Sequence, residues 1–278
     1  MSTFAEMLEL TNNSSDGIKK YIERNFDIVN KNSEIVPFVL NPIQIKYLLF
    51  DMSGRDIILK ARQEGFSSLI LARFTKDFLT KPNSRSVVVA DIDENAIELL
   101  DKVKFYIRSY EEKNKVKVPL KYNTRSEIYN EANNARYSIG TAQNTEFGRS
   151  KTITNLHLSE SAFYPNLEKI LAGAGQAVVP NGYFVIETTA NGFNEFKSFW
   201  DDSVLGLTGF KPLFYRASDF YSEEFLAKKK VELKRLYPQE YPDNPQEAFL
   251  TSGSQFFDSG ALRIYLEEVQ NVAPVPII

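Results

Sequence analysis

The hydrophobic positions of this chain follow two alternating periods, and the alternation predicts strands separated by helices. The segments 57–59, 135–141 and 152–158 have the character of strands, and 86–90 and 182–188 that of buried strands, with 86–90 a continuous β-branched run. Apolar residues spaced three and four apart predict helices over 67–79, from Asp93 to beyond Ile107, over 167–177 and from Asn194 onward. Strands that alternate with helices in this way predict an α/β fold with a doubly wound, mostly parallel sheet.

The flanking stretches have a different character. Residues 1–30 show helical spacing, and Asn41-Pro42 suits the cap and first residue of a further helix. Residues 113–135 are rich in lysine and asparagine and predict turns with short edge strands. From about Lys211 the pattern changes to a capped helix over 223–237 and then a proline-punctuated segment, which predicts a small subdomain.

Composition excludes several classes of protein and site. The 278 residues are 43% hydrophobic and 25% charged, which is ordinary for a globular protein with a sizeable core. The chain has no cysteine and a single histidine, His157, so disulfides, thiolate metal sites and multi-histidine metal clusters are excluded. No apolar run approaches the roughly 18 residues of a membrane span, and the start has no secretion signal.

A net charge of -3 gives no overall indication of nucleic-acid binding, so any basic surface must be local. Candidates are Lys228–Lys230 with Lys234 and Arg235, or the lysines of 113–121. Such runs are more often a solvated helix face than a DNA site.

The segment 60–68 (Lys-Ala-Arg-Gln-Glu-Gly-Phe-Ser-Ser) joins the first buried strand to a helix. Backbone N–H groups and the helix dipole at such a junction favour a bound phosphate. The usual phosphate-loop pattern is G-x-x-x-x-G-K-[ST]. Gly65 and Ser67 fit it, but Lys60 replaces the first glycine and Phe66 replaces the lysine.

Ser159 and Glu160 end another buried strand, where phosphate-loop NTPases hold magnesium and orient the attacking water. Glu160 would act as general base, whereas Ser159 would reach magnesium only through a water. The alternative is that Ser159 caps the next helix and Glu160 is a favourable acid in its first turn.

Three further positions are weaker candidates. Arg149, beside Gly148, suits an arginine finger, although most surface arginines are merely solvated. The segment 188–192 could sense a γ-phosphate, or form a threonine cap and an Asn-Gly turn. Gln44 could pair its amide with a purine edge, or be an exposed first-turn glutamine.

Taken together, Phe38…Gln44, 60–67, 158–163 and 188–192 resemble the large terminase subunit of tailed bacteriophages, over roughly residues 35–258. The resemblance extends to 245–249 and 256–258. It implies a P-loop NTPase fold with a small C-terminal lid subdomain. It also implies ATP and Mg²⁺ as cofactors, and ATP hydrolysis that drives viral double-stranded DNA into a procapsid.

The same resemblance assigns roles to individual residues. Lys60 or Arg62 would replace the missing loop lysine, Gln44 would read adenine, and Glu160 would be the catalytic carboxylate. Arg149 would be a finger acting on a neighbouring subunit. The Mg²⁺ ligands would be Ser67, Ser159 through a water, and Glu160. The remaining nucleotide-binding residues would be Ala61, Gln63, Glu64, Gly65, Phe66, Ser67 and Ser68. The coupling motif would be Thr188, Thr189, Ala190, Asn191 and Gly192.

The resemblance also implies partners and a division of the chain. Expected partners are double-stranded DNA, the portal protein and the small terminase subunit, with a homo-oligomeric ring on the portal, a monomer alone and no membrane. The place of action would be the host cytoplasm, transiently at the portal vertex. We expect an ATPase core over 1–210 and a lid over 211–252. Residues 253–278 would start a linker toward a nuclease domain that this chain lacks.

Phe66 and Ser159 depart from the family pattern and predict slow ATP hydrolysis in isolation. Two other functions stay open: a nucleotide-gated DNA-binding or assembly module with little hydrolysis, and a helicase-like P-loop ATPase. The intact Glu160 favours hydrolysis over the first of these.

Overall fold

The structure is a computed structural model that describes residues 13–144, 152–250, 264, 265 and 268. Its α-helices are α2 (Ser15–Asn25), α3 (Pro42–Lys46), α4 (Phe66–Thr80), α5 (Asp93–Asn114), α6 (Leu167–Gly173), α7 (Glu195–Val204), α8 (Glu223–Leu233), α9 (Tyr237–Glu240) and α10 (Pro245–Leu250). Its strands are β1 (Asp27–Val29), β2 (Ile35–Pro37), β3 (Arg55–Lys60), β4 (Arg85–Ala90), β5 (Leu120–Asn123), β6 (Glu127–Asn130), β7 (Ala135–Thr141), β8 (Ile153–Ser159), β9 (Val178–Thr188) and β10 (Lys211–Tyr215). A π-helical turn, η1 (Tyr47–Asp51), follows α3, and short 3₁₀ turns lie at Ser161–Phe163, Gly175–Ala177, Ala217–Asp219 and Lys234–Leu236.

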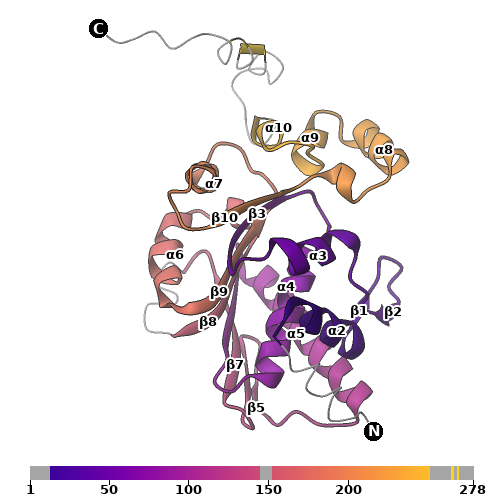
Figure 1. Cartoon of the computed structure of the whole chain (residues 1–278), viewed down its shortest axis with the longest axis vertical. Helices are drawn as coiled ribbons and strands as arrows, with labels where there is room; N and C mark the ends of the chain where they lie inside the picture. Colours follow the sequence, from indigo (N-terminus) through magenta and orange to yellow (C-terminus); the bar gives the residue numbers. More distant parts are fainter. Residues whose placement is uncertain (1–12, 145–151, 251–263, 266–267, 269–278) are drawn as a thin grey trace.

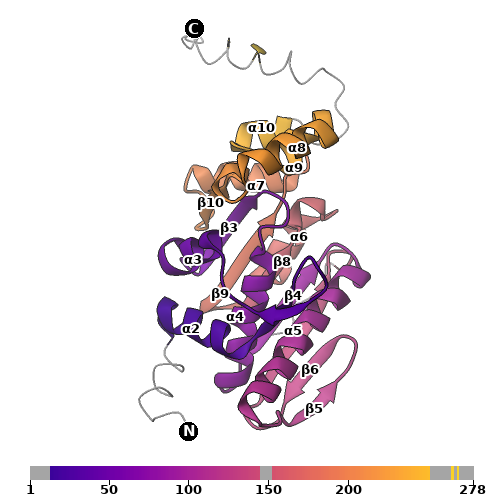
Figure 2. The ribbon, with the colours of Figure 1, turned by 90° about the vertical axis from the view of Figure 1, so that its right-hand side faces the viewer.

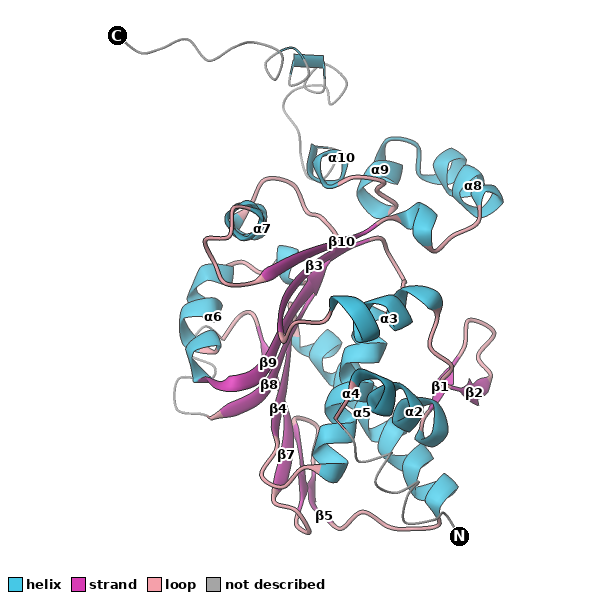
Figure 3. Cartoon of the chain, viewed as in Figure 1, coloured by secondary structure: helices cyan, strands magenta, loops and turns pink. Residues whose placement is uncertain are grey.

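One eight-stranded sheet forms the centre of the molecule, in the order β10-β3-β9-β8-β4-β7-β6-β5 (Figures 1 and 3). The six strands from β10 to β7 are parallel, and β6 and β5 add an antiparallel edge. This arrangement confirms the predicted mostly parallel α/β sheet. The antiparallel edge falls within 113–135, where turns and short edge strands were expected.

Helices cover both faces of the sheet, which explains why central strands such as β3 and β4 are buried along almost their whole length. α2, α4 and α5 lie on one side, and α6 and α7 on the other (Figure 1). Alternate residues of each strand enter one of two separate hydrophobic clusters. Ile58 and Val185 face α4, whereas Ile57 and Ile186 face α6 and α7. This alternation determines which polar side chains at the strand ends share a face.

The sheet extends into the region where the sequence predicted a separate lid. β10 pairs in parallel with β3, so the first residues after 210 complete the sheet. Leu213 and Tyr215 explain this, because both are buried against the core cluster on the α4 side. The chain then forms α8, α9 and α10, which lie together beyond the end of β3 (Figure 2). The boundary at 210/211 stays a prediction.

Other differences from the predicted elements are local. The helix expected over 167–177 ends at Gly173 and continues as a 3₁₀ turn, and β9 starts at Val178 rather than near Gly182. The first described helix, α2, is capped by the Ser14 hydroxyl, which accepts from the Gly17 N–H. None of the helices in the described residues is both long and apolar enough to cross a membrane.

Candidate functional site

The carboxyl ends of β3, β9 and β8 meet at one edge of the sheet. Leu59 pairs with Thr188, and Ser159 pairs with Glu187, so these strands end at nearly the same level. Because β9 lies between β3 and β8, its last residues separate the loop strand from the strand that carries Glu160. Open parallel sheets bind ligands at such an edge.

The loop between β3 and α4 has the backbone of a tight phosphate-binding turn. Gln63 and Gly65 both adopt positive φ angles, 60° and 83°. A side chain at position 65 would also collide with the Gln44 amide, since its Cβ would lie 2.7 Å from Nε2. Glycine is therefore required there, and the N–H groups that open α4 follow it directly.

The N-terminus of α3 is joined to this loop by two hydrogen bonds. Gln44 Nε2 donates to the Gly65 carbonyl at 2.7 Å, and Asn41 Nδ2 donates to the Glu64 carbonyl at 3.0 Å. Asn41 and Gln44 also form a capping box, in which Gln44 Oε1 accepts from the Asn41 N–H. Gln44 is thus buried rather than an exposed first-turn residue, and both ends of its amide already have partners. Its contact with adenine stays a prediction that requires it to exchange at least one of them.

Lys60 and Arg62, the two candidate loop cations, point to different places. Lys60 is almost completely buried, with Nζ 3.2 Å from Glu160 Oε1 and 3.1 Å from Glu187 Oε2. Burial by itself would lower the pKa of Lys60, but the two carboxylates outweigh it and raise the pKa above its ordinary value. Arg62 is 61% exposed and pairs with Glu240 of α9 at 3.0 Å.

Phe66 replaces the usual loop lysine and faces away from the loop. It is 1% exposed, and its ring centroid lies 4.7 Å from that of Tyr215 and 5.7 Å from that of Tyr47. The side chain at this position therefore fills the core between η1, α4 and β10. Ala61 is buried as well, in a small cluster with lid residues that include Leu226 and Tyr241.

Glu160 follows β8 in a left-handed backbone conformation, with φ 56° and ψ 44°. Non-glycine residues in this region are uncommon and occur preferentially at functional sites. Its Oε2 lies 3.4 Å from Thr188 Oγ1 and 3.3 Å from the Thr189 N–H, which both donate to it. The side chain remains 39% exposed, so water reaches the carboxylate.

Ser159 does not cap the next turn. Glu160 occupies the cap position there without a side-chain hydrogen bond, and Ser159 Oγ instead donates to Glu187 Oε1 at 2.8 Å. Ser67 Oγ, at the start of α4, donates to the same oxygen at 2.7 Å. Both hydroxyls that the sequence assigned to magnesium therefore converge on a third residue.

That residue, Glu187, was missed by the sequence analysis. It is completely buried, and its side chain faces α4 because Val185, two residues earlier, does. Burial alone would raise its pKa, but Lys60 and the hydrogen bonds from His157 and Ser67 hold the pKa well below the ordinary value. A signal was present in the sequence, because a lone acid in a continuous apolar strand is costly unless it is paired.

The segment 188–192 contacts both the turn that carries Glu160 and the helix α9. Thr188 Oγ1 accepts from the Ala162 N–H at 3.2 Å, just after Glu160. The Ala190 carbonyl accepts from Gln239 Nε2 of α9 at 3.3 Å. Gly192 has a positive φ, and the helix that follows is capped by Asn194 rather than by a threonine. The segment therefore touches both the acidic edge and the lid.

Two other predicted features lie elsewhere. Arg149 falls outside the described residues. Three of the four lysines of 113–121 are paired with acids: Lys113 with Asp27, Lys117 with Glu111 and Lys121 with Glu131. In the run from Lys228 to Arg235, Lys229 pairs with Glu232. The pairing favours the solvated-face interpretation for 113–121.

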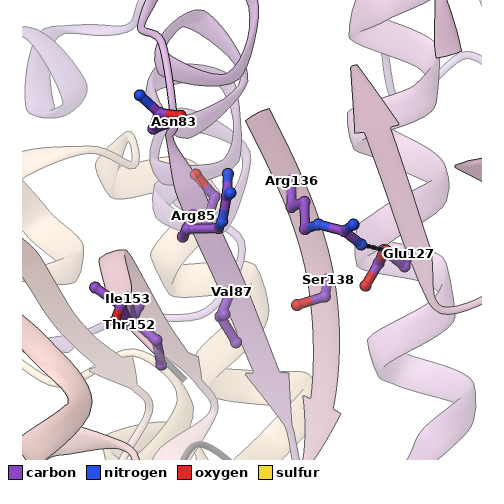
Figure 4. Close-up of a pocket in the computed structure, with 9 residues that line it drawn as sticks. Asn83, Arg85, Val87, Glu127, Arg136, Ser138, Thr152 and Ile153 are labelled. Carbon is purple, nitrogen blue, oxygen red and sulfur yellow. Dashed lines mark hydrogen bonds and ion pairs between the residues drawn. The ribbon is translucent and has the colours of Figure 1, made fainter. Parts of the chain in front are cut away.

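A cavity of about 470 Å³ lies at the opposite edge, where β4, β7 and β8 begin (Figure 4). Its two arginines already have partners. Arg136 is paired with Glu127, and Arg85 donates to the carbonyls of Ser84 and Asn134. The cavity lies at the edge of the sheet opposite the strand ends that carry Glu160 and Glu187.

Glu64 is a buried carboxyl inside the loop itself. It is 0% exposed, and within the described part of the chain neither of its carboxyl oxygens has a hydrogen-bond partner. Burial raises the pKa of Glu64 from 4.5 to about 9; Lys60 lowers it only in part, and Asp219 raises it further. At neutral pH the side chain is protonated, so it does not repel a phosphate held by the loop.

This raised pKa predicts a pH-dependent stability difference between the wild type and Glu64→Gln. The unfolded chain releases the Glu64 proton near pH 4.5 and the folded chain near pH 9, so the carboxyl destabilises the fold increasingly as the pH rises between them. The amide does not titrate. Relative to the wild type, the variant should therefore gain up to about 4 kcal/mol between about pH 5 and pH 8, since the full linkage slope is about 1.4 kcal/mol per pH unit.

Denaturant unfolding at the two pH values measures the gain, and Glu64→Met, which cannot titrate either, should show the same one. A constant offset between variant and wild type at both pH values would contradict the raised pKa.

Comparison with known proteins finds no matching family model and no matching curated protein. Solved structures do match. The large terminase ATPase domain of Thermus phage P74-26 aligns with a TM-score of 0.59 and 16% identity, over 72% of this chain and 92% of that one. The HK97 bacteriophage large terminase gives 0.59 and 15%, over 92% of this chain and 53% of that one.

The large terminase of the thermophilic bacteriophage D6E, solved with ATP-gamma-S, gives a TM-score of 0.53 and 11% identity over 73% of this chain. The alignment spans 52% of the D6E protein, so this chain matches about half of it, as it does for HK97. At such low identity the likeness concerns the fold. This chain shares its fold with the large terminase ATPase domain of Thermus phage P74-26 and with the HK97 large terminase.

Proposed function

We propose that this chain is the ATPase of a viral DNA-packaging motor, which hydrolyses ATP to move double-stranded DNA into a procapsid. The observation that carries the proposal is the convergence of Lys60 and Glu160 beside the loop that opens α4. A cation, an accessible carboxylate and free helix N–H groups at one strand edge are the parts that phosphoryl transfer to water requires. The fold shared with large terminase ATPase domains agrees with it.

In this proposal Lys60 is the loop cation. Its Nζ already lies at the acidic edge, whereas Arg62 points outward to Glu240. The phosphates would bind to the N–H groups from Gly65 to Ser68, and Lys60 would turn from its carboxylate partners to the γ-phosphate. The D6E terminase was solved with ATP-gamma-S and with ADP, which supports nucleotide binding by this fold.

The donor set at the edge fits Mg²⁺, which prefers oxygen ligands and retains several waters. Ser67 Oγ would be a direct ligand, with Glu160 and Ser159 acting near the ion or through water. Two carboxylates face one ammonium group there, so the cluster carries excess negative charge. No group of three or more acidic or histidine side chains in the described residues holds a metal by itself, so phosphate oxygens would complete the coordination. A bound Mg²⁺ would neutralise charge on the β- and γ-phosphates.

Glu160 would orient and deprotonate the attacking water. The Thr189 N–H and Thr188 hydroxyl hold its Oε2, while its exposed side chain stays within reach of solvent. The same contacts would couple the chemistry to motion, because residues 188–192 also contact α9 through Gln239. Loss of the γ-phosphate would shift Glu160, then this segment, then the lid. Arg149 would complete the site of a neighbouring subunit in a ring on the portal, with the small terminase subunit as a further partner.

The proposal is tested by ATP turnover of the purified chain with and without linear double-stranded DNA. We expect slow basal hydrolysis, stimulation by DNA, and a steep loss of that stimulation with salt as phosphate contacts weaken. Nucleotide binding without turnover under any of these conditions would favour the nucleotide-gated module instead. Separation of the strands of a forked duplex would favour the helicase-like alternative.

A further inference from the structure

Glu187 makes more polar contacts than the neutralisation of one lysine requires. Its Oε2 faces Lys60 Nζ at 3.1 Å, and this contact alone would balance the charges. Its Oε1 accepts from Ser67 Oγ at 2.7 Å and Ser159 Oγ at 2.8 Å, and lies 3.2 Å from His157 Nε2. The two oxygens therefore have different partners, one cationic and one formed by hydroxyls and a ring nitrogen.

The position of Glu187 in the sheet matches the position where β8 lacks an acid. Ser159 and Glu187 are direct partners in the register of β8 and β9. Both side chains point toward α4, and neighbouring strands lie roughly 4.8 Å apart. A glutamate is long enough to reach back across this spacing, as its contact with Ser159 Oγ demonstrates. A carboxylate on β9 thus lies beside the Ser159 hydroxyl, next to the position from which an acid at the end of β8 would act.

The contact with Ser67 has a specific chemical consequence. A serine hydroxyl that ligates Mg²⁺ gives its lone pair to the ion and needs an acceptor for its proton. P-loop NTPases provide a carboxylate beside this hydroxyl from the acidic strand. Here Ser67 Oγ donates its proton to Glu187 Oε1, and Ser159 Oγ donates to the same oxygen, so the acceptor beside Ser67 is Glu187 rather than the residue at 159.

We propose that Glu187 replaces the missing acid of β8: it orients Ser67 for Mg²⁺ and supplies the second carboxylate of the magnesium–nucleotide site. This inference rests on the proposed ATPase function and adds a residue to its site. In this role Glu187 is a positioning residue that acts through Ser67, and it also anchors Lys60 while no phosphate is bound. His157, the single histidine, lies with Nε2 3.2 Å from Glu187 Oε1, the oxygen that also accepts from Ser67.

The test measures the binding of a fluorescent ATP analogue while Mg²⁺ is titrated, for the wild type, Glu187→Gln and the double variant Ser159→Asp/Glu187→Gln. We expect Glu187→Gln to raise the Mg²⁺ concentration for half-maximal binding by about 10- to 100-fold, as is typical when a group that orients a metal ligand is lost. Nucleotide binding in EDTA should change little. The double variant, with its carboxylate returned to β8, should recover most of the magnesium affinity.

A merely structural counter-ion would give a different result: lower thermal stability in Glu187→Gln with unchanged magnesium dependence in the folded protein, which would overturn the inference. If Glu187→Gln does not fold, the double variant decides. A half-maximal Mg²⁺ concentration about tenfold above that of the wild type, measured in the folded double variant, would overturn the inference. A wild-type chain that binds no magnesium–nucleotide would overturn both this inference and the proposed function. Normal binding by the wild type with an unaffected Glu187→Gln would overturn only the inference.

Discussion

Glu160→Gln should abolish DNA-stimulated ATP hydrolysis while leaving nucleotide binding close to that of the wild type. The amide keeps the size of the side chain and can still accept from the Thr189 N–H, but it cannot take a proton from water. Loss of a positioned general base typically costs about 10²- to 10⁴-fold in rate. Because we expect the wild type to hydrolyse ATP slowly, phosphate release by the variant should be too slow to detect.

Steady-state phosphate release with and without DNA measures the loss, and binding of a fluorescent nucleotide shows that the site remains formed. Glu168→Gln is the matched control, because Glu168 is an exposed acid in the first turn of α6 that makes no contact with Glu160, Glu187 or Lys60 among the described residues. It should hydrolyse ATP like the wild type. Turnover by Glu160→Gln within about threefold of the wild type would remove Glu160 from the chemistry, since general-base catalysis is worth far more than that.

Lys60→Met should both destabilise the fold and prevent nucleotide binding. The ammonium group compensates Glu187, which is completely buried, and removal of one partner of a buried ion pair costs roughly 3 to 5 kcal/mol. The loop would lose its cation in the same change, so affinity for ATP should fall together with stability. Denaturant unfolding and nucleotide titration measure the two effects separately.

Two further variants separate stability from binding. Lys60→Met/Glu187→Gln removes both charges and should regain much of the stability without regaining nucleotide affinity, as a double-mutant cycle would show. Arg62→Met removes an exposed pair with Glu240 and should cost less than about 1 kcal/mol. The assignment of Lys60 would be reversed if Arg62→Met lost nucleotide binding while Lys60→Met, measured under conditions where it is folded, retained it.

The fold was largely predictable because its signals are local. Strands such as β4 are short apolar runs, the helices have their own apolar spacing, and several begin at a capping side chain, as with Asn41 before α3. The least predictable strand was β10. Its five residues follow a change in composition, and only the free edge of β3 makes them part of the sheet.

The candidate site was predicted in its parts but not in its connections. The sequence placed Lys60 and Arg62 in one loop but could not tell which of them faces the site. Lys60 pairs with Glu160 and Arg62 with Glu240, and the positive φ of Gln63 beside them has no clear signal in the sequence. In the sequence, Phe66 was only a departure from the family pattern that predicts slow hydrolysis. Its burial against Tyr215, 149 positions later in the chain, gives it a role in the core.

By itself, the sequence determined the layered α/β architecture, the strand ends that carry chemistry, and the pairing of a basic loop with Glu160. These follow from periodicity and from the rule that parallel strands present their carboxyl ends at one edge. The tertiary structure alone decided that β9 lies between β3 and β8, and hence that Glu187 reaches Lys60, Ser67 and Ser159. Strand order depends on how all the helices cover both faces, and no local pattern around residue 187 records it.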